Sequence, residues 1–226
     1  MNPSPPPFPL QPSVAIQESD ARFPVRRIYC VGRNYAAHRR EMGGDDRNPP
    51  FFFSKPADAV VASGSDIAYP LATADLHHEV ELVAALAAGG SNIPVARALE
   101  AVFGWAVGVD LTRRDIQAAA RAKGQPWDAA KGFDESAPIG PIQLAGGLAP
   151  QGRIRLSVNG RTRQDATVSD MIWNVAEIIA EASKLWRLAP GDLIYTGTPE
   201  GVGPLERGDH VEAAIDGVGE LDFRIV

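Results

Sequence analysis

Two acidic residues, Glu79 and Glu81, lie two positions apart inside the apolar run "HHEVELVAAL". The run is typical of a strand, and alternation along a strand places both glutamates on one side with His77, and His78 and Val80 on the other. Two ionised carboxylates on one face repel each other, and burying them without a partner is costly. A chain that folds around this segment therefore needs a cation there.

A second apolar segment, "FGWAVGVDL", is also typical of a strand and ends at Asp110. If the two strands are neighbours, Asp110 completes a shell of three carboxylates, and oxygen ligands select Mg²⁺, Mn²⁺ or Ca²⁺ over zinc. The alternative is that Glu79 and Glu81 face solvent, but the apolar flanks disfavour exposed strands. Of His77 and His78, we expect one near the site and the other packed in the core.

Composition narrows the class of protein. The 226 residues are 45% hydrophobic, and the net charge of -6 without a basic run argues against a nucleic-acid partner. The apolar runs are shorter than the roughly 18 residues of a membrane span, so no membrane association is expected. Cys30, the single cysteine, excludes an internal disulfide and fits a reducing, cytoplasmic compartment.

The sequence predicts a short N-terminal arm followed by a single large domain. Five prolines in the first nine residues favour an extended arm, and we expect residues 1–24 to lie outside one domain over residues 25–226. A strand ending at Gly32 is followed by a short helix pattern in "NYAAHRREMGG". The longest helix pattern is "SDMIWNVAEIIAEASKLWRL", which Ser169 can cap.

The remaining segments complete an α+β fold dominated by sheet. "IPVARALEAVFG" and "TRRDIQAAARAKG" favour short helices, the second closed by Gly124. After Pro190, glycine-punctuated segments predict short strands and tight turns.

Six segments occur in the order found in the fumarylacetoacetate hydrolase family, which the chain resembles over residues 25–226: "YCVGRNYAAHRREMG", "PPFFFSKPADAVV", "LHHEVELV", "VGVDLTRRDIQ", "AKGFDESAPIGPI" and "GDLIYTGTPEGVGPL". Within that family the chain looks closest to the bacterial branch that hydrolyses fumarylpyruvate in gentisate degradation. The resemblance implies a mixed β-sheet roll with a few short helices and one longer helix, and a homodimer. It also implies a Mg²⁺ or Mn²⁺ ion on Glu79, Glu81 and Asp110, the acids that the charge argument selects.

The resemblance also assigns catalytic residues. His38 and Glu41, three residues apart, would activate water, with Glu41 orienting the imidazole. Lys131 would stabilise an oxyanion or enolate opposite the metal. Gln117 would donate a hydrogen bond to the tetrahedral oxyanion.

Substrate contacts are predicted from the charges that a substrate such as fumarylpyruvate carries. Thr198, with Gly197 in the turn "YTGTPEGVG", would receive the substrate carboxylate. Arg33 and Lys55 would contact the far carboxylate of a dicarboxylic substrate, or else pair with local acids. Trp127 would cover the site or pack against the core.

The sequence thus predicts a metal-dependent hydrolase that cleaves a carbon–carbon bond of a small β-diketo acid, most simply fumarylpyruvate to fumarate and pyruvate. Acylpyruvate hydrolysis, oxaloacetate decarboxylation or tautomerisation, and dienoate isomerisation or decarboxylation use the same metal site and remain alternatives. A third alternative is a metal-binding or scaffold protein without catalytic activity. The pair His38 and Glu41 discriminates between them, because only hydrolysis needs activated water.

Overall fold

The computed structural model describes residues 11–35 and 48–226, and the largest sheet in this part of the chain is eight-stranded. The main path of the sheet has the order β4-β3-β15-β8-β9-β11-β5, and β12 pairs with β9 beside it. These strands are β3 (Arg27–Gly32), β4 (Phe51–Lys55), β5 (Val60–Ala62), β8 (Val80–Leu86), β9 (Val102–Val109), β11 (Ala137–Ile139), β12 (Gln143–Leu144) and β15 (Asp192–Tyr195).

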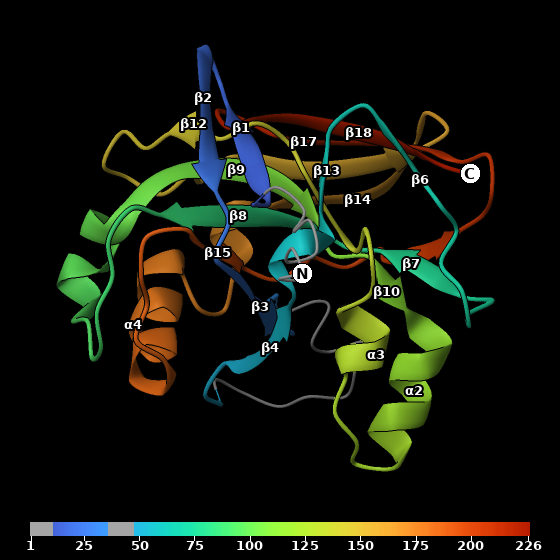
Figure 1. The fold of residues 1–226 in the computed structure, drawn as a ribbon, viewed down its shortest axis with the longest axis horizontal. Helices are drawn as coiled ribbons and strands as arrows, with labels where there is room; N and C mark the ends of the chain where they lie inside the picture. The colour runs from blue at the N-terminus through green and yellow to red at the C-terminus, as the bar shows by residue number, and fades with distance from the viewer. Residues whose placement is uncertain (1–10, 36–47) are drawn as a thin grey trace, which may run out of the picture.

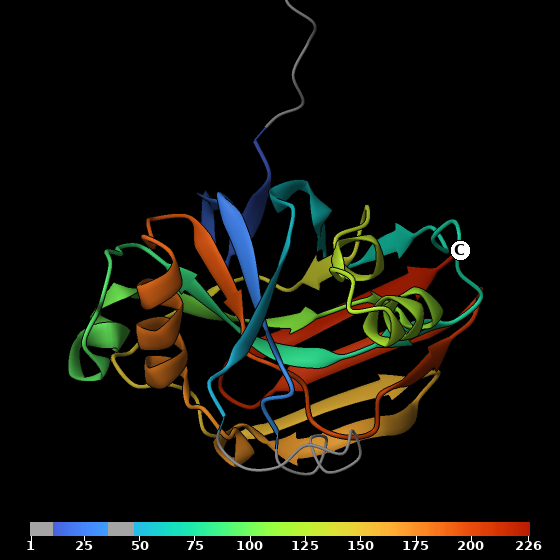
Figure 2. The ribbon, with the colours of Figure 1, turned by 90° about the horizontal axis from the view of Figure 1, so that it is seen from below.

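A five-stranded sheet of order β14-β13-β17-β18-β6 packs along β8 and β9 as a second layer (Figure 2). Its strands are β6 (Ser65–Ile67), β13 (Arg153–Val158), β14 (Arg161–Thr167), β17 (His210–Ile215) and β18 (Gly219–Ile225). The smaller sheets are formed by β7 (Leu76–His78), β10 (Thr112–Arg113) and β16 (Gly203–Leu205), and by β1 (Ser13–Ile16) and β2 (Ser19–Pro24). Parallel and antiparallel pairs both occur, which confirms the predicted mixed, rolled β fold.

Helices flank the sheets rather than cover them. In Figure 1, α4 lies on one side of β3 and β4, and α2 and α3 lie on the other. The helices are α2 (Arg114–Ala122), α3 (Asp128–Lys131), α4 (Val175–Leu185) and the 3₁₀ turns η1 (Ala57–Ala59), η2 (Val95–Ala101) and η3 (Val168–Asp170). None of the helices in the described ranges combines the length and apolar character that crossing a membrane requires.

The start of α4 differs from the prediction. Asn174, not Ser169, caps the helix: the Asn174 side chain accepts from the Glu177 amide at 3.1 Å, and the Glu177 carboxylate accepts from the Asn174 amide at 3.0 Å. This reciprocal capping box satisfies two donors that a helix start leaves unpaired. Ser169 belongs to η3 instead. The helix expected in "NYAAHRREMGG" lies almost entirely outside the described residues.

Strand β8 is buried on both faces along its whole length. Leu82 and Ala84 belong to the core shared with the five-stranded sheet, whereas Val83 and Ala85 belong to a second core on the opposite face. A strand that is covered on both faces has apolar residues along its whole length rather than at every second position. This explains why nearly all residues of "VELVAAL" are apolar. Any charge on β8 is therefore placed inside the protein.

The predicted boundary at residue 24 is wrong for the described part of the arm. The hairpin β1–β2 packs on the second core, and Val14 and Phe23 are 3% and 5% exposed. Its backbone also joins the fold, because the Ile142 amide donates to the Ala15 carbonyl at 2.8 Å. Residues 13–24 therefore belong to the folded body; prolines earlier in the chain do not prevent a hairpin from forming here.

Candidate active site

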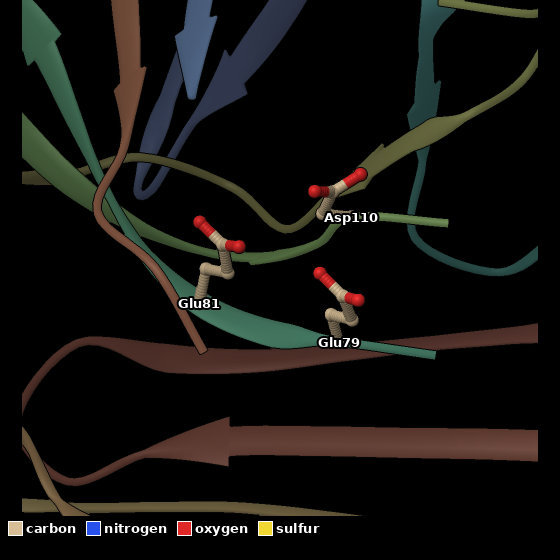
Figure 3. A group of neighbouring side chains, drawn as sticks. All are labelled: Glu79, Glu81 and Asp110. Atoms are coloured by element: carbon tan, nitrogen blue, oxygen red, sulfur yellow. The ribbon is translucent and has the colours of Figure 1, made fainter. Parts of the chain in front are cut away.

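Glu79, Glu81 and Asp110 converge as the strand pattern predicts. Val80 pairs with Val109 across β8 and β9, so the residues that flank this pair lie side by side. The Asp110 amide donates to the Glu79 carbonyl at 2.8 Å. Carboxylate oxygens from the three residues lie within 4.8 Å of one another, and all three side chains are buried (Figure 3).

Three protein cations surround these carboxylates. The Lys131 ammonium, at the end of α3, donates to Glu79 at 2.9 Å, to Asp110 at 2.5 Å and to the Thr112 hydroxyl at 2.6 Å. The Lys55 ammonium lies 2.8 Å from the other oxygen of Asp110. Arg114, in the first turn of α2, forms an ion pair with Glu79.

The charges of this cluster sum to zero if all six groups are ionised, three negative against three positive. Burial alone lowers the pKa of the Lys131 ammonium, but the attraction of Asp110 and Glu79 outweighs it and raises that pKa above its usual value. The cation that the sequence requires beside these acids is therefore supplied in this structure by lysine and arginine side chains.

Glu81 is the least compensated of the acids. The Gly197 amide donates a hydrogen bond to its carboxylate at 2.7 Å. Burial, and then repulsion from Asp110 and Glu79, raises the pKa of the Glu81 carboxyl well above its usual range. A cation placed among the three acids would remove this repulsion.

The residues present fit a hard divalent ion. The ligand set is three carboxylates, the oxygen chemistry that Mg²⁺ and Mn²⁺ prefer. One oxygen of Asp110 forms no hydrogen bond of good geometry although Lys55 is near it, and it is available as a ligand. A cavity of about 30 Å³ adjoins Glu79 and Glu81, room for about one ion or water.

Several other predicted residues line the same small cavity. Arg33, Gln117, Lys131 and Thr198 all lie on its wall. The Gln117 carbonyl oxygen accepts from Arg114 at 2.5 Å, which turns the donor end of the amide away from that arginine. The Lys131 ammonium uses its three hydrogens in the bonds to Glu79, Asp110 and Thr112. It must break one of these bonds before it can donate to a substrate oxygen.

Two predicted substrate contacts are corrected. Lys55 is 3% exposed and pairs with Asp110, so the pairing alternative holds and the side chain is not placed to meet a far carboxylate. The Gly197 amide already donates to Glu81, so it supports a carboxylate of the protein rather than one of a substrate. His38 and Glu41 lie outside the described residues, and their roles stay predictions.

Sequence reasoning missed Arg114 and the aromatic side chain of Phe53 beside the site. Arg114 lies three residues before Gln117, so helical spacing places both on one face and was the available signal. Phe53 and Trp127 also line the small cavity, with ring centroids 6.0 Å apart. Together with Arg33 they border a neighbouring cavity of about 740 Å³, so Trp127 packs against Phe53 and lines both cavities.

The two histidines face opposite ways. His77 contacts Asp75 at 2.8 Å, on the side of Glu79. His78 is fully buried toward the five-stranded sheet, where its Nδ1 lies 3.0 Å from the Gln164 side-chain oxygen. Burial lowers the pKa of His78 to about 4, which keeps that ring neutral.

The fold and this acid–base cluster define a small-molecule enzyme with a candidate metal centre, and comparison with known proteins gives its family. Residues 27–226 match the family model described as "Fumarylacetoacetate (FAA) hydrolase C-terminal", and the chain belongs to this family. The fumarylpyruvate hydrolase of Pseudomonas aeruginosa, crystallised with Mn²⁺ and pyruvate, is 52% identical with a TM-score of 0.95 over 99% of both chains.

Two curated relatives carry different activities in their names. A fumarylpyruvate hydrolase from a Ralstonia species is 44% identical over 176 residues, covering 77% of this chain and 92% of the relative. A mitochondrial oxaloacetate tautomerase from Mus musculus is 42% identical over 202 residues, covering 88% of this chain and 91% of the relative. The comparisons therefore show an enzyme of this family and leave its reaction between hydrolysis and isomerisation.

Proposed function

We propose that the protein is a metal-dependent hydrolase that cleaves fumarylpyruvate to fumarate and pyruvate. The observation that carries the proposal is the charge of the buried cluster. Three carboxylates and the cations Lys55, Lys131 and Arg114 sum to zero when ionised, so a divalent ion gives these six groups a net charge of +2, apart from Arg33 on the cavity wall. A dicarboxylate substrate brings the matching charge of -2. A substrate with two carboxylates is therefore favoured over an acylpyruvate with one.

Glu79, Glu81 and Asp110 would hold the ion. When bound, Mg²⁺ or Mn²⁺ supplies Lewis acidity toward the 2-oxo acid end of the substrate. The Thr198 hydroxyl receives the adjacent carboxylate, and the Gln117 amide donates toward the oxyanion that water addition creates. Lys131 moves one of its ammonium hydrogens from a carboxylate to the oxygen of the departing pyruvate enolate.

Water activation is assigned to His38 with Glu41. The imidazole takes a proton from the water molecule that attacks the carbonyl carbon of the fumaryl group, and Glu41 stabilises the charged ring. The carbon–carbon bond then breaks, and the pyruvate carbon recovers a proton. We expect His38→Ala to leave divalent-metal affinity unchanged and to slow hydrolysis about 100-fold or more. A normal rate would place the base elsewhere.

The second candidate is oxaloacetate tautomerisation, favoured by the 42% identity with the mouse enzyme of that name. Oxaloacetate also carries two carboxylates, so the charge of the cluster does not separate the two substrates. The two reactions differ in their need for water, because hydrolysis consumes a water molecule whereas tautomerisation only moves a proton. The pair His38 and Glu41 is needed for the first reaction, but the metal and Lys131 suffice for enolate chemistry.

An absorbance assay of enol loss tests the proposal. The panel comprises fumarylpyruvate, an acetylpyruvate and oxaloacetate, each with Mg²⁺, with Mn²⁺ and with a chelator. We expect metal-dependent loss of the fumarylpyruvate signal with stoichiometric fumarate and pyruvate, the highest kcat/KM of the panel. Preference for oxaloacetate without a cleavage product would establish the tautomerase instead.

We also propose a homodimer, which the family resemblance supports. Light scattering on the metal-loaded protein measures this directly: a mass near twice the 24.1 kDa of the chain is expected, and a mass of one chain at assay concentration contradicts it.

A further inference from the structure

Gln164 connects the five-stranded sheet to the turn that carries Thr198. It lies in β14, at the edge of that sheet, and its side chain is fully buried. The turn packs directly on this strand at Gly201, where a Cβ would lie 2.1 Å from the Arg163 carbonyl oxygen. Only glycine allows so close an approach at that backbone conformation (φ 89°). Gln164 is thus held against the turn.

Two backbone groups fix the orientation of the Gln164 amide. The Val80 amide is a donor and lies 3.0 Å from Oε1, so that atom must be the oxygen. The Pro199 carbonyl is an acceptor and lies 2.9 Å from Nε2, so that atom must be the nitrogen. Exchanging the two atoms would set donor against donor and acceptor against acceptor.

This orientation determines what the neighbouring side chains do. Nε2 lies 2.8 Å from Thr198 Oγ1 and must donate to it, because an amide nitrogen accepts nothing. Oε1 lies 3.0 Å from His78 Nδ1, so that ring nitrogen carries its hydrogen. The amide then uses both hydrogens and accepts two bonds, which satisfies it completely and rigidifies it.

The Thr198 hydroxyl consequently has its own hydrogen left to give. Thr198 is 3% exposed and lines the small cavity with Glu79, Glu81 and Lys131. Its oxygen is occupied by the amide on the side of the five-stranded sheet. The remaining hydrogen is therefore available to an acceptor in the cavity, as a substrate carboxylate requires.

We propose that Gln164 is a positioning residue that sets the Thr198 hydroxyl as a hydrogen-bond donor to the substrate carboxylate, with His78 holding Gln164 from behind. The inference rests on the proposed function only in that a carboxylate occupies the cavity beside Thr198. It assigns to the five-stranded sheet, which contributes none of the carboxylates, a part in substrate orientation. Gln164 acts through Thr198 and does not touch the substrate.

A double-mutant cycle between Gln164→Met and Thr198→Val tests this coupling. The readout is the affinity of the Mn²⁺-loaded protein for oxalate, measured by calorimetry, which needs no turnover. Thr198→Val removes a hydrogen bond to a charged group, so we expect about 10- to 100-fold weaker binding. Gln164→Met should weaken it about 5- to 10-fold, and the double variant should match Thr198→Val alone.

Controls separate positioning from loss of structure. Thr198→Ser keeps the hydroxyl and should retain most of the affinity. Ser183→Ala, in α4, removes two hydrogen bonds that involve no residue of the cavity wall; it should lower the unfolding midpoint and leave oxalate affinity unchanged. Gln164→Met should raise KM for the substrate more than it lowers kcat, since ground-state orientation is what it loses.

Independent, multiplicative effects of the two variants on oxalate affinity would overturn the proposal, as would a Gln164→Met variant that loses stability but binds oxalate normally. Oxalate binding with the expected coupling but no fumarylpyruvate turnover would support this inference and refute the proposed hydrolase. A wild-type protein that binds Mn²⁺ but no oxalate would refute both.

Discussion

The two sides of the segment from β7 to β8 solve the problem of buried polarity differently. On one side, Glu79 and Glu81 meet Asp110, and ionised lysine and arginine side chains compensate them. On the other side, His78 meets Gln164 in a neutral network completed by Thr198 and backbone groups. One side balances charges, and the other matches donors with acceptors.

This difference determines which of the two sides can change its interactions when a metal ion or a substrate binds. On the neutral side the Gln164 amide uses both of its hydrogens and accepts two bonds, so its orientation is fixed and it is suited to hold a substrate group in place. A cluster of charges can exchange one cation for another, so it is suited to admit a metal ion and then an anion. Removing one member leaves an unpaired ion on the charged side, but only an unpaired dipole on the neutral side.

Glu81→Ala should have the largest effect on function. The variant loses one ligand of three, so we expect no measurable Mg²⁺ or Mn²⁺ binding in the micromolar range and at least about a 1,000-fold loss of turnover. Calorimetry and the enol assay measure the two. Glu100→Ala, at an exposed ion pair, is the control. Normal turnover by Glu81→Ala would end the metal hypothesis.

Lys131→Met should have the largest effect on stability. It leaves Glu79 and Asp110 buried without the ammonium that bridges them, so we expect the metal-free protein to lose about 3–5 kcal/mol of unfolding free energy in urea. Added Mn²⁺ should recover part of this loss, because a second cation can replace the first. A loss below about 1 kcal/mol would show that the lysine does not compensate the acids. Lys184→Met, at an exposed pair, is the matched control.

His78→Leu tests the neutral side, and we expect a smaller cost. It breaks one hydrogen bond and leaves the Gln164 oxygen with one partner, so about 1–2 kcal/mol is lost while metal affinity is unchanged. His78→Asn places an amide nitrogen as many bonds from the backbone as Nδ1, and should recover stability in part. A cost equal to that of Lys131→Met would remove the distinction between the two sides.

Arg97→Ala should have the smallest effect. Its bond to Glu100 lies on the surface, with both side chains more than half exposed. Water screens such a pair, so the urea midpoint should not change measurably. A clear shift would mean that exposed and buried ion pairs are closer in value than the comparison assumes.

The sequence predicts the carboxylate cluster because its signals are local. Acids within or next to the apolar segments that form β8 and β9 are expected to be buried, and strand alternation fixes which side Glu79 and Glu81 share. The positive charges that compensate these acids could not be predicted from local sequence. Lys55 and Lys131 come from elements far along the chain, and only the folded topology brings their ammonium groups to Asp110.

Two errors have physical causes. The prolines of the first nine residues predict an extended arm but say nothing about residues 10–24, where alternation in "SVAI" and "DARFP" allows strands that bury Val14 and Phe23. The apolar pattern of the longest helix begins early in the sequence, which favours Ser169 as its cap. The pair Asn174 and Glu177, an N-x-x-E signature, was the stronger local signal.

The hairpin β1–β2 has a practical consequence. The family match starts at residue 27, which invites trimming the chain there. Val14 and Phe23 pack in the core cluster that includes Ile28 and Phe103, so a protein cut at that point would expose apolar surface there. Exposed apolar surface of this kind promotes aggregation. A purification tag is better attached ahead of residue 11, so that the trimmed product keeps its apolar cover.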